Sequence, residues 1–84
     1  MDERELKAVL AAGGVKRVHI IANGDAFSVR ADTPGGNFTI GTAKKFIRTW
    51  ATADSAMKWL RKLGVGEARL DFSKWQPKQR GLGL

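Results

Sequence analysis

The chain has 84 residues, which is the length of one small domain. It contains no cysteine, which excludes disulfides, thiolate metal sites and cysteine nucleophiles. Fifteen basic residues against eight acidic ones give a net charge of +7, which favours a polyanionic partner. Residues 1–5 lack the basic and apolar regions of a signal peptide, and no apolar run could span a bilayer. We therefore expect a cytoplasmic protein with no membrane partner.

A short helix is predicted at the start of the chain. Asp2 is in position to cap it, and Glu5 three residues later completes the capping-box pattern. The apolar residues between 6 and 10 follow helical spacing and share one face. Gly13-Gly14 is expected to end the helix, because glycine adopts the left-handed conformation needed there.

Residues 15–31 are predicted to form a β-hairpin with Asn23-Gly24 as its two-residue turn. In this register the large apolar residues all fall on one face of the hairpin, which a shift of one residue would destroy. The apolar pairs are Ile20 with Phe27 and Val18 with Val29.

The polar face of this hairpin carries His19 opposite Ser28 and Arg17 opposite Arg30. The two arginines would form a like-charge pair, which is mildly destabilising unless an anion or a carboxylate lies between them.

Two further strands are predicted before the second helix, at 37–42 and 46–51. Thr52 is the expected N-cap of that helix and Gly64 its end. A last strand is predicted at 67–72. The apolar stripe of the second helix is Ala56, Met57, Leu60 and Leu63, widened by Trp59.

The predicted order is α-β-β-β-β-α-β, which indicates an α+β fold. We expect an antiparallel sheet of about five strands with the helices packed on one face. Residues 1–72 would form the domain, and 73–84 a flexible basic tail that folding does not need. The residues expected to be largely buried are Leu6, Val18, Ile20, Phe27, Val29, Phe38, Ile40, Leu60, Leu63 and Leu70.

Nothing in the sequence predicts catalysis. His19 is the single histidine and is interpreted as a strand residue on the polar face of the hairpin. No carboxylates are spaced as metal ligands, and Gly35-Gly36 lacks the strand and helix that flank a phosphate-binding loop. We expect no enzyme activity, no metal and no cofactor.

The basic residues suggest instead a surface that contacts phosphates, with DNA expected rather than RNA. Trp75 lies among basic residues and could stack on bases or enter an apolar pocket of a partner. The predicted nucleic-acid-binding residues are Arg17, Arg30, Lys44, Lys45, Arg48, Lys58, Lys62, Lys74, Trp75, Lys78 and Arg80.

Two alternatives stay open. The basic residues could be a solvated surface on which lysines protect the sheet edges from pairing. The protein could also be an interaction module, which docks a protein partner through a strand edge or through Trp75, or pairs with a second copy edge to edge.

Part of the chain resembles a family. The stretch from Phe46 to Val65, with Arg-Thr-Trp in a strand and a helix ending in Leu-Gly-Val, followed by Arg69-Leu70-Asp71-Phe72, is similar to small partition-associated proteins of the ParC type. These are encoded on bacterial plasmids and integrative elements. The resemblance covers about a third of the chain and implies an accessory role in plasmid maintenance or control, without catalytic residues. This chain stops soon after the last strand, where such proteins continue into a longer charged segment.

Overall fold

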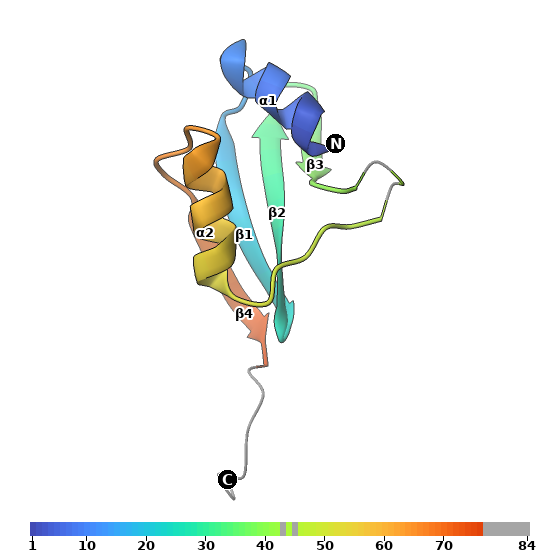
Figure 1. Ribbon diagram of the computed structural model, residues 1–84, viewed down its shortest axis with the longest axis vertical. Helices are drawn as coiled ribbons and strands as arrows, with labels where there is room; N and C mark the ends of the chain where they lie inside the picture. The colour runs from blue at the N-terminus through green and yellow to red at the C-terminus, as the bar shows by residue number, and fades with distance from the viewer. Residues whose placement is uncertain (43, 45, 77–84) are drawn as a thin grey trace, which may run out of the picture.

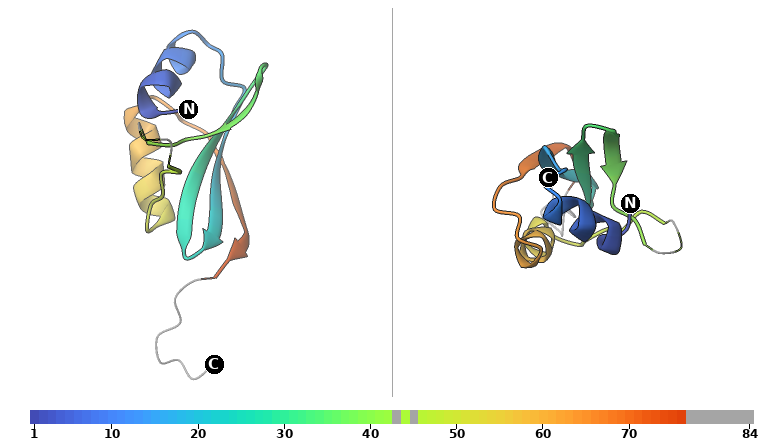
Figure 2. Two further views of the ribbon diagram at one scale, coloured as in Figure 1. Left: turned by 90° about the vertical axis from the view of Figure 1, so that its right-hand side faces the viewer. Right: turned by 90° about the horizontal axis from the view of Figure 1, so that it is seen from above.

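Figure 1 shows a computed structural model of the protein, which describes residues 1–42, 44 and 46–76. In this described part of the chain, four strands form one sheet in the order β3-β2-β1-β4. Figure 2 shows that both helices lie on the same face of this sheet. In chain order the elements are α1 (Glu3–Ala11), β1 (Arg17–Gly24), β2 (Ala26–Thr33), β3 (Gly36–Thr39), α2 (Ala53–Lys62) and β4 (Arg69–Trp75).

The predicted α+β class is confirmed, but the prediction of about five antiparallel strands is wrong. The sheet has four strands and is mixed: β1 pairs antiparallel with β2, and β2 with β3, whereas β4 runs parallel to β1. A parallel neighbour needs a crossover connection, and α2 provides it between β3 and β4. The crossover places the last strand beside the first, which the order of elements alone does not reveal.

The strand predicted at 46–51 is not formed. This segment makes only two isolated bridges, between Gly41 and Ile47 and between Phe27 and Trp50. β3 occupies one end of the free edge of β2 and stops at Thr39. The chain then loops out and returns, so that Trp50 exchanges two backbone hydrogen bonds of 2.9 and 2.8 Å with Phe27. The two segments therefore share one edge of β2 instead of forming two strands.

The predicted hairpin is present, and its apolar residues share one face as expected. The predicted register is wrong by one residue on each strand, because Ile20 lies opposite Val29 and Ala22 lies opposite Phe27. The tip is Gly24-Asp25 in place of Asn23-Gly24. Gly24 has a φ of +66°, so the residue that most easily adopts this conformation occupies the first turn position.

The new register changes the polar face. Arg17 lies opposite Asp32, and Arg30 lies opposite His19. The predicted like-charge pair of Arg17 and Arg30 is therefore wrong, and Arg17 is paired in register with an acid. An anion between the two arginines is no longer needed to explain this face.

The helix ends follow the sequence closely. The Asp2 carboxylate accepts a 2.8 Å hydrogen bond from the Glu5 amide, and the Glu5 side chain accepts one of 3.2 Å from the Asp2 amide. Thr52 caps α2 through the Ser55 amide at 3.1 Å. At its other end the Val65 amide donates to the Leu60 carbonyl at 3.1 Å, and Gly64 has a φ of +92°. This is the predicted glycine-terminated ending.

The core lies between the helices and the two central strands. Among the residues expected to be buried, Leu63 is half-buried, and Phe38 and Leu70 are 39% and 49% exposed. Met57, placed in the apolar stripe of α2, is 56% exposed. The helices cover β1 and β2, whereas Phe38 and Leu70 stand on the outer strands. The buried apolar residues are Leu6, Val18, Ile20, Ala22, Phe27, Val29, Ala31, Ile40, Ala56 and Leu60.

The last strand continues through Trp75, three residues beyond the predicted boundary at 72. The Trp75 ring packs against Phe27 with a centroid distance of 6.3 Å. The Gln76 amide then donates a 2.7 Å hydrogen bond to the Gly24 carbonyl at the hairpin tip. Residues 73–76 are therefore part of the fold, and the rest of the predicted tail lies outside the described residues. No helix in the described part of the chain is long and apolar enough to cross a membrane.

Candidate functional site

A basic groove lies between α2, the start of β1 and the start of β4. Its volume is about 970 Å³, and its floor is apolar, with Val18, Ile20 and Leu60. Among the described residues, five basic residues from three segments (residues 16–17, α2 and β4) line it, together with two acidic residues. The basic residues are Lys16, Arg17, Lys58, Arg61 and Arg69, and the acidic ones are Asp54 and Glu67.

The local structure explains why these residues meet at one end of the sheet. Arg17 begins β1, and Arg69 begins β4, which runs parallel to β1 in the neighbouring position, and parallel pairing brings the two strand starts together. Arg17 and Arg69 alternate with Val18 and Leu70, which face the helices, so their side chains leave the sheet on the opposite face. Arg61 projects from the exposed side of α2, whose buried side carries Leu60. The crossover through α2 therefore assembles the groove.

Most cations of the groove have no acidic partner. Lys58 pairs with Asp54 on the same helix at 3.2 Å. Within the described ranges, the side chains of Lys16, Arg17, Arg61 and Arg69 form no ion pair. The groove therefore carries a net positive charge, with five cations and two acids in its described lining, which favours an anionic ligand.

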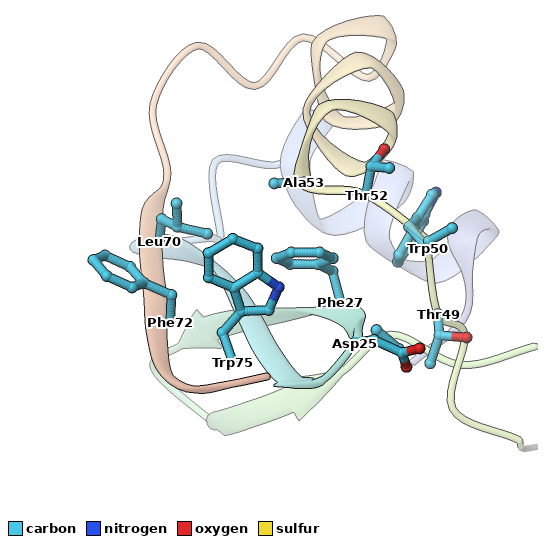
Figure 3. A pocket seen from close by; sticks show the side chains of 11 residues that line it. Asp25, Phe27, Thr49, Trp50, Thr52, Ala53, Leu70, Phe72 and Trp75 are labelled. Atoms are coloured by element: carbon cyan, nitrogen blue, oxygen red, sulfur yellow. The ribbon is translucent and has the colours of Figure 1, made fainter. Parts of the chain in front are cut away.

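An apolar groove of about 820 Å³ adjoins the basic one (Figure 3). Its lining includes Phe27, Trp50 and three residues of β4, namely Leu70, Phe72 and Trp75. The three β4 side chains are 49%, 61% and 45% exposed. Leu70 lines both grooves, so the two meet at this residue of β4.

The structure divides the predicted nucleic-acid-binding residues. Arg17 and Lys58 line the basic groove, and Trp75 lines the apolar one. Lys44, Lys62 and Lys74 are exposed but line neither groove. The predicted residues outside the described ranges are Lys45, Lys78 and Arg80.

Three groove residues, Lys16, Arg61 and Arg69, were missing from the predicted set. Arg61 lies beside Lys58 and Lys62 on the predicted helix, which was the only signal for it. No sequence pattern indicated Arg69, because its position beside the start of β1 depends on the parallel pairing of β4.

Arg48 belongs to a cluster that holds the fold together. Its guanidinium lies 4.9 Å from the ring centroids of both Trp50 and Trp59 and 3.2 Å from the Glu3 carboxylate. The Trp59 indole N–H donates a 2.8 Å hydrogen bond to Glu3. The hydrogen bond from Trp59, and then that from Arg48, lower the pKa of Glu3. These contacts join α1, the segment before α2, and α2 itself, so Arg48 has a structural role.

Arg30 is also engaged, on the face of the sheet away from the helices. His19 is buried, with 8% of its surface exposed, and its Nε2 lies 2.7 Å from Asp32 Oδ2. Arg30 Nε donates to the other Asp32 oxygen at 3.2 Å. The described residues contain no group of three or more side chains that could hold a metal ion. The cluster is thus a satisfied polar network on a strand pair.

The pKa of Asp32 is lowered, mainly by the hydrogen bond from His19 and also by the nearby Arg30 charge. A carboxylate with a lowered folded pKa contributes stability above its unfolded pKa of about 3.9, and this contribution is lost as the pH falls through the folded value. We therefore expect the thermal midpoint of Asp32→Asn to fall less than that of the wild type between about pH 6 and about pH 2. Calorimetry across this range measures it, with Glu67→Gln as the exposed control. Parallel curves for Asp32→Asn and the wild type would contradict the expectation.

Comparison of the chain with protein-family models, with curated proteins and with solved structures finds no match. The resemblance to partition-associated proteins therefore stays a prediction, and the functional argument rests on the two grooves.

Proposed function

We propose that this protein is a non-enzymatic accessory protein that binds nucleic acid through the basic groove. DNA is the expected ligand, and the cytoplasm the expected location. The resemblance to plasmid partition proteins supports a role in the maintenance or control of a mobile element.

One observation carries the proposal: Lys16, Arg17, Arg61 and Arg69 line one groove without an ion pair among the described residues. Elsewhere, Lys7, Arg30 and Arg48 each have a carboxylate within 3.5 Å. Four further cations without an ion pair among the described residues line neither groove, namely Arg4, Lys44, Lys62 and Lys74. What distinguishes the groove is that residues 16–17, α2 and β4 each place at least one unpaired cation in the lining of one concave surface. Phosphate groups would supply the missing charges, and contacts to phosphate give affinity without sequence preference.

The proposal predicts a steep salt dependence of binding. Four phosphate contacts would give a slope of log K against log salt of about −3 to −4 on duplex DNA and about −3 on a single strand. Removing two of the cations, in the double variant Arg17→Gln/Arg61→Gln, should reduce the size of this slope by about 2 on a duplex. Titration of labelled oligonucleotides, single-stranded and duplex, at low and near-physiological salt measures both.

The matched control removes the same charge elsewhere. Arg4→Gln/Lys44→Gln alters two exposed cations, on α1 and in the loop after β3, that line neither groove. This variant should keep the wild-type slope. An equal loss in both double variants would show that net charge, and not the groove, binds the ligand. Absence of binding to every oligonucleotide at low salt would reject the proposal.

A second candidate function is docking of a protein partner on β4. All seven residues of this strand are exposed, and its outer edge pairs with no described strand. The edge is interrupted, however, because β4 has one extra residue relative to β1 between Asp71 and Lys74. The Ser73 amide there is satisfied by the Asp71 carboxylate at 3.0 Å. Such a bulge disrupts further strand pairing, so edge-to-edge dimerisation has only a short stretch available.

A further inference from the structure

The two grooves differ in chemistry but share Leu70 in their linings. The basic groove ends at Leu70, and the apolar groove begins there. Leu70 lies opposite Ile20, on the helix side of the sheet. A ligand that follows the helix side of β4 towards Trp75 therefore passes from a groove lined by cations to exposed aromatic rings.

The exposed aromatic rings of β4, Phe72 and Trp75, offer a surface for a flat ligand. Trp75 is fixed on one side by Phe27, at 6.3 Å between ring centroids, while 45% of its surface stays exposed. Phe72 is 61% exposed. Figure 3 shows the Trp75 and Phe27 rings beside each other, with the Phe72 ring on the other side of Trp75. The fixed Trp75 ring offers a face on which another ring can stack at little cost in side-chain entropy, and the exposed Phe72 ring offers a second face.

The charge distribution specifies the ligand further. Among the described residues, Asp25 is the only charged one that lines the apolar groove, whereas five cations and two acids line its neighbour. A chain that alternates phosphates with flat aromatic groups matches this pair of surfaces. In a duplex the bases are stacked on each other and do not reach protein rings, whereas unpaired bases do.

We infer that the ligand of the basic groove is a single-stranded nucleic acid, whose phosphates contact the groove cations while its bases stack on Phe72 and Trp75. This inference rests on the proposed function, and it adds the class of nucleic acid and the residues that contact the bases.

The test compares three labelled ligands of about 16 nucleotides: single-stranded oligo-dT, an abasic strand of the same length, and a duplex. The wild type should bind oligo-dT more tightly than the abasic strand. Phe72→Ala should lose about 5- to 150-fold in affinity for oligo-dT, because stacking of one base contributes about 1–3 kcal/mol. Its affinities for the abasic strand and the duplex should not change.

Two further variants separate stacking from other effects. Phe46→Ala removes a phenylalanine that is 70% exposed but lines neither groove, and it should bind as the wild type does. Phe72→Trp keeps a stacking surface and should retain the affinity for oligo-dT. Phe72→Leu, which keeps an apolar side chain without a ring, should lose most of what Phe72→Ala loses.

The outcomes are distinguishable. Equal binding of oligo-dT by the wild type and Phe72→Ala, or preference of the wild type for the duplex, would overturn the inference and leave the proposed function standing, provided that the salt slope remains. If no oligonucleotide binds at low salt, both fail. If Phe72→Ala instead abolishes self-association in sedimentation runs without nucleic acid, a second copy covers the apolar groove and the inference is wrong.

Discussion

Replacement of Leu60 with alanine is expected to lower the free energy of unfolding by about 2–5 kcal/mol, because it deletes a buried side chain and leaves a cavity. Leu60 is 2% exposed and is the largest buried side chain of α2. For a domain of this size the thermal midpoint should fall by roughly 8–40 °C. Thermal unfolding followed by circular dichroism measures the change.

Met57→Ala is the matched control on the same helix. Met57 is 56% exposed, so its truncation should change the free energy of unfolding by only about 0.5 kcal/mol. The sequence places both residues in one apolar stripe, whereas the structure buries only Leu60. Comparable losses in the two variants would show that α2 packs with a different face.

Deletion of residues 73–84 is expected to cost about 2–4 kcal/mol, in contrast to the dispensable tail predicted from the sequence. It removes the end of β4, including the packing of Trp75 on Phe27 and the hydrogen bond from Gln76 to Gly24. A fully buried tryptophan contributes about 3–5 kcal/mol, and Trp75, being 45% exposed, should contribute about half of that. Lost backbone hydrogen bonds add to this value. The midpoint should fall by roughly 8–30 °C.

The shorter deletion of 77–84 is the control, and it keeps the whole of β4. Its midpoint should stay within a few degrees of that of the full chain, as for surface changes away from the core. If both deletions leave the midpoint unchanged, Trp75 does not hold the end of the sheet. If both lower it equally, the stabilising contacts lie after residue 76.

Local sequence patterns specified the ends of the helices and the division of the hairpin into an apolar and a polar face. Asp2 and Thr52 cap the helices as their side chains predict, and the glycine at 64 ends α2 with a positive φ. The alternation of Ile20 and Phe27 correctly predicted the buried face. These features depend on residues within a few positions of each other, so the sequence specifies them directly.

The hairpin register shows where local rules stop. A shift of one residue on each strand leaves every side chain on its own face, so the apolar pattern cannot distinguish the two registers. The two registers differ in which residues form the turn, and in the structure Gly24 adopts a φ of +66° at the tip. The shift moved Arg17 from Arg30 to Asp32 and thereby changed the charge pattern on which the first hypothesis depended.

Tertiary structure alone decided the candidate site. Net charge indicated a polyanion, but it did not show that Arg48 and Arg30 are held by carboxylates while Arg61 and Arg69 are not. That distinction follows from the parallel docking of β4 beside β1, which joins strand starts about 50 residues apart in sequence. The same docking leaves Phe72 61% exposed, because α2 packs mainly against β1 and β2. Which cations are free and which rings are exposed are consequences of long-range contacts, and short-range sequence patterns do not contain them.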